Sequence, residues 1–166
     1  MGPRLGEQIL YLSRADVASC GVSPGEMNVA MEAMFRAKAE GRAWMQPKML
    51  IARPDGQSFC AKGGVMSRPD YGAVKWFGYF TGNEHFGRPD FLPLIILNEG
   101  ESGMPIAIMD GTWISAFRTG SLTAVTAKYM ARPDADSVGF VACGLQARSN
   151  FAALMASFRL RRAVLL

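Results

Sequence analysis

The stretch that decides the fold is VGFVACGLQARSN, residues 138–150. Apolar residues run into a glycine and then into a helix-forming segment, which is the order of a strand, a turn and a helix. A dinucleotide-binding turn has the pattern G-x-G-x-x-G/A, and this stretch has A-C-G-L-Q-A. Gly144 and Ala147 fit the second and third positions, whereas Ala142 takes the place of the first glycine. The stretch alone leaves two interpretations open, a nucleotide site and an ordinary strand–helix corner.

The segments on either side of this stretch supply the context that a dinucleotide site needs. Residues 161–166, RRAVLL, predict a second strand about 20 residues after the first. Residues 112–131 predict a long helix before the first strand, and Arg132-Pro133-Asp134 ends it. A two-stranded parallel sheet by itself leaves an edge unpaired and one face bare. We therefore expect the chain to be a truncated version of a longer protein.

The first part of the chain has a different pattern of elements. Residues 8–12 predict a short strand, and Ser13 and Asp16 after it have the spacing of a capping box. Ser23, Pro24 and Glu26 have the spacing that starts a second helix. Short strands separated by turns follow between residues 44 and 80, and FLPLIILN and MPIAIMD predict a buried β-hairpin. The predicted fold class is α/β: an α+β substrate-binding and dimerisation domain, followed by the first β-α-β part of a Rossmann-type domain. The two domains are predicted over residues 1–115 and 116–166.

Composition excludes several classes of protein. The 166 residues are 49% hydrophobic with a net charge of +4, and the basic residues form no dense run of the kind that nucleic-acid binding needs. The three cysteines are far apart and favour neither a disulfide framework nor a metal site. The longest apolar stretch, FLPLIILN, is too short to span a bilayer. We expect a soluble, cytoplasmic protein that binds neither nucleic acid nor membranes, with reduced thiols and no metal.

Two basic residues stand in apolar surroundings. Arg118 lies within the predicted helix beside Thr119, and burying its guanidinium is costly unless an anion meets it. A surface arginine or an internal ion pair would explain the same pattern. Lys75 lies between Val74 and Trp76 in a predicted strand, where it could equally point to solvent on the alternating face.

Several motifs together resemble the ornithine cyclodeaminase/mu-crystallin family. They are GMPIAIMDGT at 103–112, RTG at 118–120, AVTAKYMAR at 124–132 and VACGLQAR at 141–148. The resemblance extends from about residue 47 to residue 158 and is most specific between residues 103 and 147. It implies a homodimer that binds NAD, with NADP as the alternative, and a small amino acid or cyclic imine as substrate.

The resemblance also assigns roles to residues of this chain. Lys75 would bind the substrate carboxylate, and Arg118 would contact substrate and cofactor. Lys48, in Pro47-Lys48, stands where the family often has Pro-Arg as a further carboxylate anchor, and lysine offers a point charge in place of a bidentate fork. The family's proton-shuttling aspartate and its ribose-binding acidic residue would lie beyond Leu166. The predicted cofactor-binding residues are Arg118, Thr119, Gly144, Leu145 and Gln146.

The implied activity is conversion of L-ornithine to L-proline and ammonia, with the hydride borrowed and returned by NAD. Alternatives are an NAD(P)-dependent ketimine reductase or amino-acid dehydrogenase of the same family, and a non-catalytic dimerising fragment. Two departures from the family pattern bear on the cofactor. Ala142 replaces the first glycine, and Asp90 replaces a cofactor-binding threonine, where its carboxylate would repel a pyrophosphate.

Overall fold

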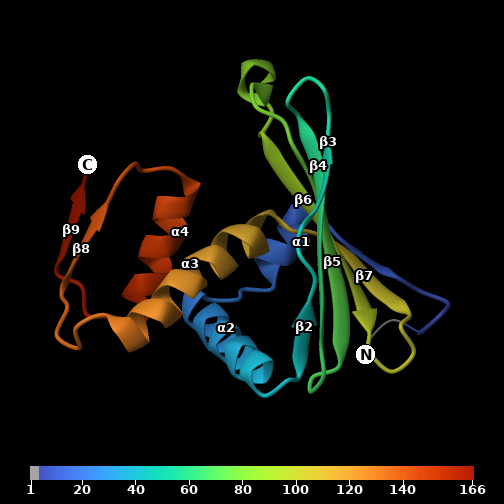
Figure 1. Cartoon of the computed structure of the whole chain (residues 1–166), viewed down its shortest axis with the longest axis horizontal. Helices are drawn as coiled ribbons and strands as arrows, with labels where there is room; N and C mark the ends of the chain where they lie inside the picture. Colours follow the sequence, from blue (N-terminus) through green and yellow to red (C-terminus); the bar gives the residue numbers. More distant parts are fainter. Residues whose placement is uncertain (1–3) are drawn as a thin grey trace. The chain divides into compact units, whose positions relative to one another are not determined.

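The computed structural model describes residues 4–166, which separate into two compact units (Figure 1). The first unit contains residues 4–20 and 37–112, and the second contains residues 21–36 and 113–166. The fold is mixed α/β, as predicted. Each unit is described below by itself.

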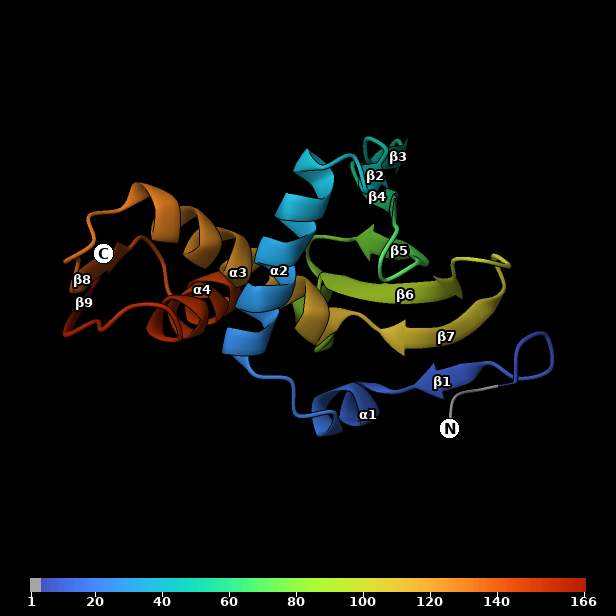
Figure 2. The same ribbon diagram turned by 90° about the horizontal axis from the view of Figure 1, so that it is seen from below.

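The first unit is built on a seven-stranded sheet in the order β1-β7-β6-β5-β4-β2, with β3 also paired to β4. Neighbouring strands are antiparallel, except that β1 runs parallel to β7. Figure 2 shows β5, β6, β7 and β1 side by side. The elements of this unit are β1 Leu10–Leu12, α1 Arg14–Ser19, β2 Ala43–Met45, β3 Met49–Ala52, β4 Ser58–Met66, β5 Tyr71–Tyr79, η1 Asn83–Phe86, β6 Phe91–Glu99 and β7 Pro105–Asp110.

The register of the long strands divides this sheet into two faces, because successive side chains of a strand alternate between them. One face carries two lysines directly opposite each other, and we call it the lysine face. The other carries large side chains that remain exposed, and we call it the apolar face. The lysine face includes Cys60, Lys62, Lys75, Phe77 and Phe91, and the apolar face includes Met49, Ile51, Val65, Trp76, Leu92 and Leu94.

The second unit is a β-α-β arrangement with two further helices. Strands β8 and β9 are parallel and are connected by α4. Ala124 of α3 packs with Ala153 and Leu154 of α4 in a small core. The buried Asn28 of α2 donates hydrogen bonds to the Ala153 carbonyl and to Ser157 Oγ, each 2.9 Å long. The elements are α2 Pro24–Ala39, assigned to this unit through residue 36, α3 Thr112–Met130, β8 Ser137–Phe140, α4 Leu145–Met155 and β9 Arg162–Leu165.

The structure confirms the predicted elements and their starting signals. Ser13 and Asp16 form a reciprocal capping box at the start of α1, and Ser23 and Glu26 make the same contacts before α2. The predicted hairpin is formed by β6 and β7. Helix α3 ends at Met130, two residues before Arg132, where the sequence predicts that it stops. The predicted strand–helix–strand unit at the C-terminal side is β8-α4-β9. These elements follow from local patterns, which is why sequence periodicity finds them.

A cluster of charged and phenolic groups joins α2 to α3 within the second unit. The Glu32 carboxylate accepts hydrogen bonds from Lys128, Tyr129 and Arg36, and the Lys128 bond is 2.7 Å long. These three donors lower the pKa of Glu32 from its usual 4.5 to about 2. The ionised carboxylate is therefore the form that the folded protein stabilises.

We expect the Glu32 cluster to make stability fall at acidic pH. The folded pKa is lower than the unfolded one, so its stabilisation is complete above about pH 4.5 and is lost as the pH falls to about 2. Glu32→Gln should therefore lower the thermal midpoint at pH 6, and the difference from the wild type should become small near pH 2. Melting curves of both proteins between pH 6 and pH 2 measure this. A difference that stayed constant across that range would contradict the assignment.

Candidate functional site

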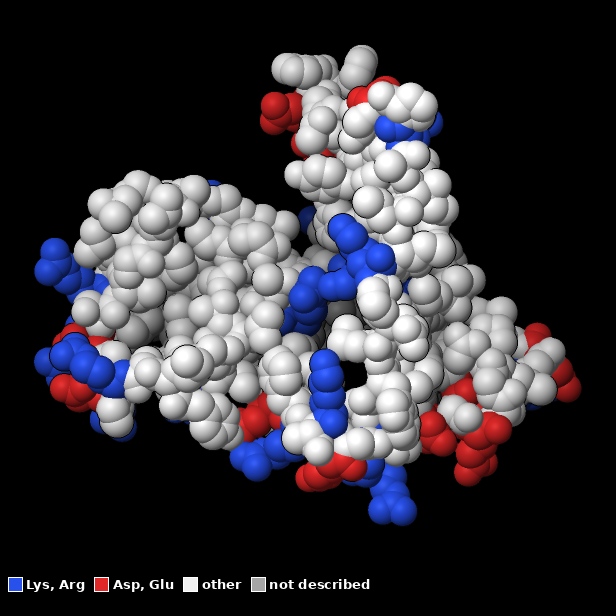
Figure 3. Space-filling model, viewed as in Figure 1, with Lys and Arg blue, Asp and Glu red and all other residues white. Residues whose placement is uncertain are grey.

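Lys62 and Lys75 are directly opposite each other on neighbouring strands of the lysine face. They are cross-strand partners in the β4–β5 ladder, and both side chains are partly buried. Figure 3 shows Lys and Arg side chains midway along this sheet, and both acidic and basic side chains at the ends of its strands. Like charges in this position repel and destabilise a sheet. An anion bound between the two ammonium groups would attract both of them and offset their mutual repulsion.

Lys48 lies near the start of a neighbouring strand. It immediately precedes β3, whose first residue Met49 is paired with Ala61 of β4. Lys48 itself lies outside the β3–β4 ladder, in the segment that connects β2 to β3. Lys48 is exposed. Both predicted substrate-binding lysines, Lys48 and Lys75, belong to the first unit, but only Lys75 lies in the strand ladder, opposite Lys62.

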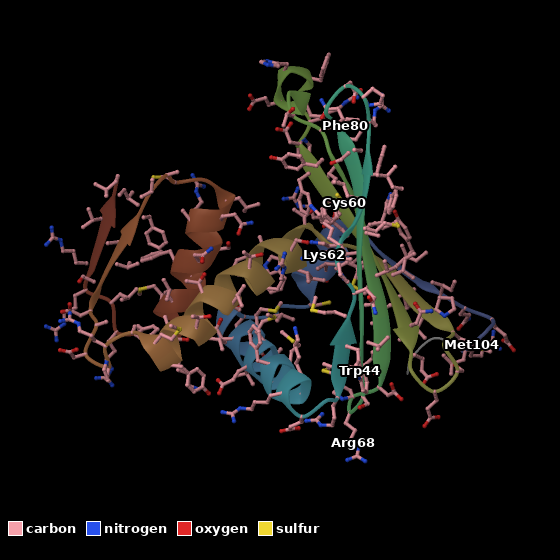
Figure 4. All side chains as sticks on the ribbon, in the orientation of Figure 1. Trp44, Cys60, Lys62, Arg68, Phe80 and Met104 are labelled. Atoms are coloured by element: carbon pink, nitrogen blue, oxygen red, sulfur yellow. The ribbon has the colours of Figure 1, made fainter. Side chains whose placement is uncertain are left out.

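Lys62 is the residue of the lysine pair that the sequence prediction missed. Figure 4 shows Cys60 and Lys62 one after the other along the strand. A signal for it was present: the turn at residues 67–70 fixes the hairpin register, and counting back from it pairs residue 62 with residue 75. Register follows from turn position and hydrophobic pattern. The predicted strands between residues 44 and 80 had no assigned ends, so this pairing could not be counted.

Arg118 lies in the middle of α3 in the second unit. It is half-buried, and burial lowers the pKa of its guanidinium. Within residues 4–166 no ion pair or hydrogen bond to this guanidinium is recorded, so an internal ion pair does not explain its position. The neighbouring Thr119 Oγ1 donates a 2.8 Å hydrogen bond to the Ser115 carbonyl and keeps its lone pairs available. This pair can offer a cation and a hydroxyl to an anionic group.

The turn between β8 and α4 has the geometry of an anion site. Gly144 precedes the helix without a side-chain cap, so the first amide groups of α4, from Leu145 and Gln146 onward, have no partner within the helix. A Cβ added at Gly144 would meet no other described atom within 4 Å, which leaves room for a phosphate to approach the backbone. Arg148 Nε donates to the Cys143 carbonyl and braces the turn. The residues of this turn fit a dinucleotide pyrophosphate.

Ala142 occupies the first glycine position in a left-handed conformation, with φ of 74°. The backbone is strained here, because a Cβ disfavours that region by roughly 1 kcal/mol. The turn still forms, since the Ala142 amide donates a 3.0 Å hydrogen bond to the Leu166 carbonyl. Alanine is the smallest side chain that can carry this strain.

Replacing Ala142 by glycine should stabilise the protein by about 0.5 kcal/mol, because the strain is removed while some unfolded-state entropy is gained. The urea midpoint at constant slope measures the change. Ala147→Gly is the matched control, because the same substitution within α4 should destabilise by about 1 kcal/mol. If both variants lost stability equally, the left-handed conformation at residue 142 would be wrong.

Asp90 closes a loop of the first unit. Its Oδ1 accepts a 2.9 Å hydrogen bond from the Asn83 amide, and its carbonyl accepts one of 3.0 Å from the Phe80 amide. The side chain therefore has a local structural role that a threonine would fill differently. Residues 4–166 contain no cluster of three or more metal-ligating side chains, and no helix among them is long and apolar enough to cross a membrane.

Several known proteins are similar to this chain in sequence and fold. The alanine dehydrogenase of Archaeoglobus fulgidus is 35% identical over 91% of this chain, which covers 46% of that enzyme. An archaeal alanine dehydrogenase dimer with bound NAD has a TM-score of 0.88 at 33% identity, over 95% of this chain and 48% of that one. The Δ1-pyrroline-2-carboxylate reductase of Thermococcus litoralis, solved with NADH and L-proline, has a TM-score of 0.89 at 29% identity, over 95% and 49%.

Further relatives show the range of activities in this group. The ornithine cyclodeaminase of Agrobacterium tumefaciens is 31% identical over 45% of this chain, which covers 22% of that enzyme. The chain spans about half the length of the first relatives it matches. The model of one family matches residues 8–165. The chain belongs to the ornithine cyclodeaminase/mu-crystallin family.

Proposed function

We propose that this chain forms the substrate-binding part and the first cofactor-binding part of an NAD-dependent enzyme that acts on the α-carbon of a small amino or imino acid. Residues 1–115 would bind the substrate and form the dimer interface, and residues 116–166 would bind the cofactor. NAD is the proposed cofactor, with NADP as the alternative, and the proposed location is the cytoplasm.

The observation that carries this proposal is the opposed pair Lys62 and Lys75 on one face of the sheet. Two ammonium groups on neighbouring strands match the two oxygens of a carboxylate, and charge-assisted hydrogen bonds are the strong ones. The two lysines would hold the carboxylate of an amino acid and fix the position of its α-carbon, and Lys48 before β3 would add a third positive charge to this unit. Orientation of the reacting carbon is the main contribution that a protein makes to cofactor chemistry.

The second unit would supply the groups for the cofactor. The amides of Leu145 and Gln146 after Gly144 would bind a pyrophosphate, and Arg118 with Thr119 would meet further anionic oxygens. When bound, a nicotinamide supplies hydride acceptance and donation at the substrate carbon. The two relatives solved with NAD or NADH support this assignment.

Among the activities of the family, net oxidation of an amino acid or net reduction of an imine is our first candidate. It is favoured by the alanine dehydrogenase at 35% identity over 91% of the chain. Ornithine cyclodeamination is the second candidate, favoured by the relative of that activity and by the same lysine pair. The two differ in whether the hydride leaves with the cofactor or returns to the product.

Incubation with NAD+ and either L-alanine or L-ornithine separates these activities. A dehydrogenase accumulates NADH at 340 nm in proportion to product, whereas a cyclodeaminase releases ammonia and proline without accumulating NADH. If NAD+ and the amino acid bound but neither reaction occurred, the non-catalytic dimerising fragment would be the remaining alternative. Absence of carboxylate binding, measured as failure of L-proline to protect Lys75 from acylation, would reject the proposed function altogether.

We also propose that two copies of the chain associate through the apolar face of the first unit. Met49, Trp76 and Leu94 lie in one row across β3, β5 and β6, and they are 50%, 39% and 37% exposed. Contiguous apolar patches of this kind mark interaction surfaces, and most soluble homo-oligomers are symmetric dimers. Sedimentation velocity should show a dimer that Leu94→Glu converts to a monomer. Lys38→Glu, which changes charge on the exposed side of α2, should remain dimeric.

A further inference from the structure

Two aromatic rings lie against the ammonium group of Lys75. Its Nζ is 5.0 Å from the ring centroid of Phe77 and 5.3 Å from that of Phe91. The two rings contact each other edge to face, with centroids 4.9 Å apart and planes at 63°. Both distances are within the range at which the face of an aromatic ring attracts a cation. The three side chains form a group that we call the aromatic cradle.

The register explains why these rings can reach the ammonium. Lys75 and Phe77 are two residues apart on β5 and so point to the same face. Phe91 is paired with Tyr79, the next residue on that face, which makes it a diagonal neighbour of Phe77. The Lys75 side chain therefore lies along the strand toward Phe77, instead of straight across toward Lys62.

The aromatic cradle offsets the repulsion between the ammonium groups of Lys62 and Lys75. Directly opposed ammonium groups repel, and a flexible lysine with four rotatable bonds would move away from its neighbour. The negative faces of two aromatic rings provide a fixed attraction on the side away from Lys62. A cation held in this way keeps a defined place for an incoming carboxylate, and less entropy is lost when the ligand binds.

We propose that Phe77 and Phe91 are positioning residues, which hold the Lys75 ammonium at the place where it meets the carboxylate of the substrate. This proposal rests on the proposed function, in which Lys75 binds the substrate carboxylate. Neither ring needs to touch the substrate for this role. The rings also place apolar surface beside the carboxylate, which suits an amino or imino acid with a small apolar body.

The position of the ammonium can be measured in the ligand-free protein. With 13C-labelled lysine, the ε-methylene protons of Lys75 should be shifted upfield by the ring currents of Phe77 and Phe91, and Lys75→Ala assigns the signal by its loss. Phe77→Leu and Phe91→Leu should each move this signal toward that of an exposed lysine. Phe77→Tyr and Phe91→Tyr keep a ring and should keep the shift. Phe59→Leu, on the opposite face of the same sheet, is the control and should leave the signal in place.

Binding of L-proline to the same variants tests the positioning role. Each leucine variant should weaken binding by about 2- to 30-fold, the range of a cation–π contact, and each tyrosine variant should bind within about twofold of the wild type. An unmoved Lys75 signal in both leucine variants would overturn the cradle. A moved signal with unchanged proline affinity would overturn the positioning role. If the wild type and Lys75→Ala bound proline equally, the proposed function would fail, and the lysine signal would still decide whether the cradle exists.

Discussion

Replacing Gly120 by alanine should destabilise the second unit by about 3 kcal/mol, the upper part of the usual range for overpacking. A Cβ at this position of α3 would lie 2.4 Å from the Ser149 carbonyl oxygen and 2.9 Å from the Asn150 amide nitrogen of α4. Both contacts are with backbone, so no side chain can turn aside. Ser121 and Ser149 are buried beside this crossing, and the two helices would have to separate.

Urea unfolding followed by circular dichroism measures this loss, and Gly25→Ala is the matched control. Gly25 lies in the first turn of α2 in the same unit, where an added Cβ would make ordinary contacts, 3.8 Å from the Ala156 Cβ and 3.9 Å from the Ser23 Oγ. Alanine forms helices better than glycine, so this variant should be neutral or slightly more stable. Equal stability of the Gly120→Ala and wild-type proteins would mean that α3 and α4 are not in backbone contact.

The sequence predicted the elements that depend on local patterns. The capping residues Ser13 and Ser23, the β6–β7 hairpin and the β8-α4-β9 unit all follow from signals within a few residues of each other. The strain at Ala142 could also be foreseen, because the missing glycine marks a position that needs a left-handed backbone.

Features that depend on distant parts of the chain could not be predicted in the same way. Gly120 and Ser149 meet because two helices pack, and no pattern within either helix specifies the partner of that glycine. The same holds for the aromatic cradle, since Phe91 reaches Lys75 only through the β5–β6 register. Lys62 is an intermediate case. Its pairing with Lys75 depends on one short turn, and the register could be counted once that turn is located.

The lysine pair should show opposite effects on stability and on binding. In the ligand-free protein, Lys62→Met removes a like-charge contact and should raise the free energy of unfolding by a few tenths of a kcal/mol, the usual size of a cross-strand pair. The same change should weaken binding of L-proline by about 10- to 100-fold, because a charge-assisted hydrogen bond to the carboxylate is lost. Lys75→Met should behave in the same way.

The double variant Lys62→Met/Lys75→Met decides whether the two ammonium groups bind one carboxylate. If they do, the loss of affinity in the double variant should be smaller than the product of the two single losses, since each lysine contributes fully only when the other holds the ligand in place. Calorimetric titration of all four proteins gives this coupling, and Lys38→Met controls for net charge. Independent losses would mean two separate anion contacts. A single variant that lost stability and kept its affinity for L-proline would mean that the lysine pair has a structural role. In that case the two ammonium groups would not bind the substrate carboxylate.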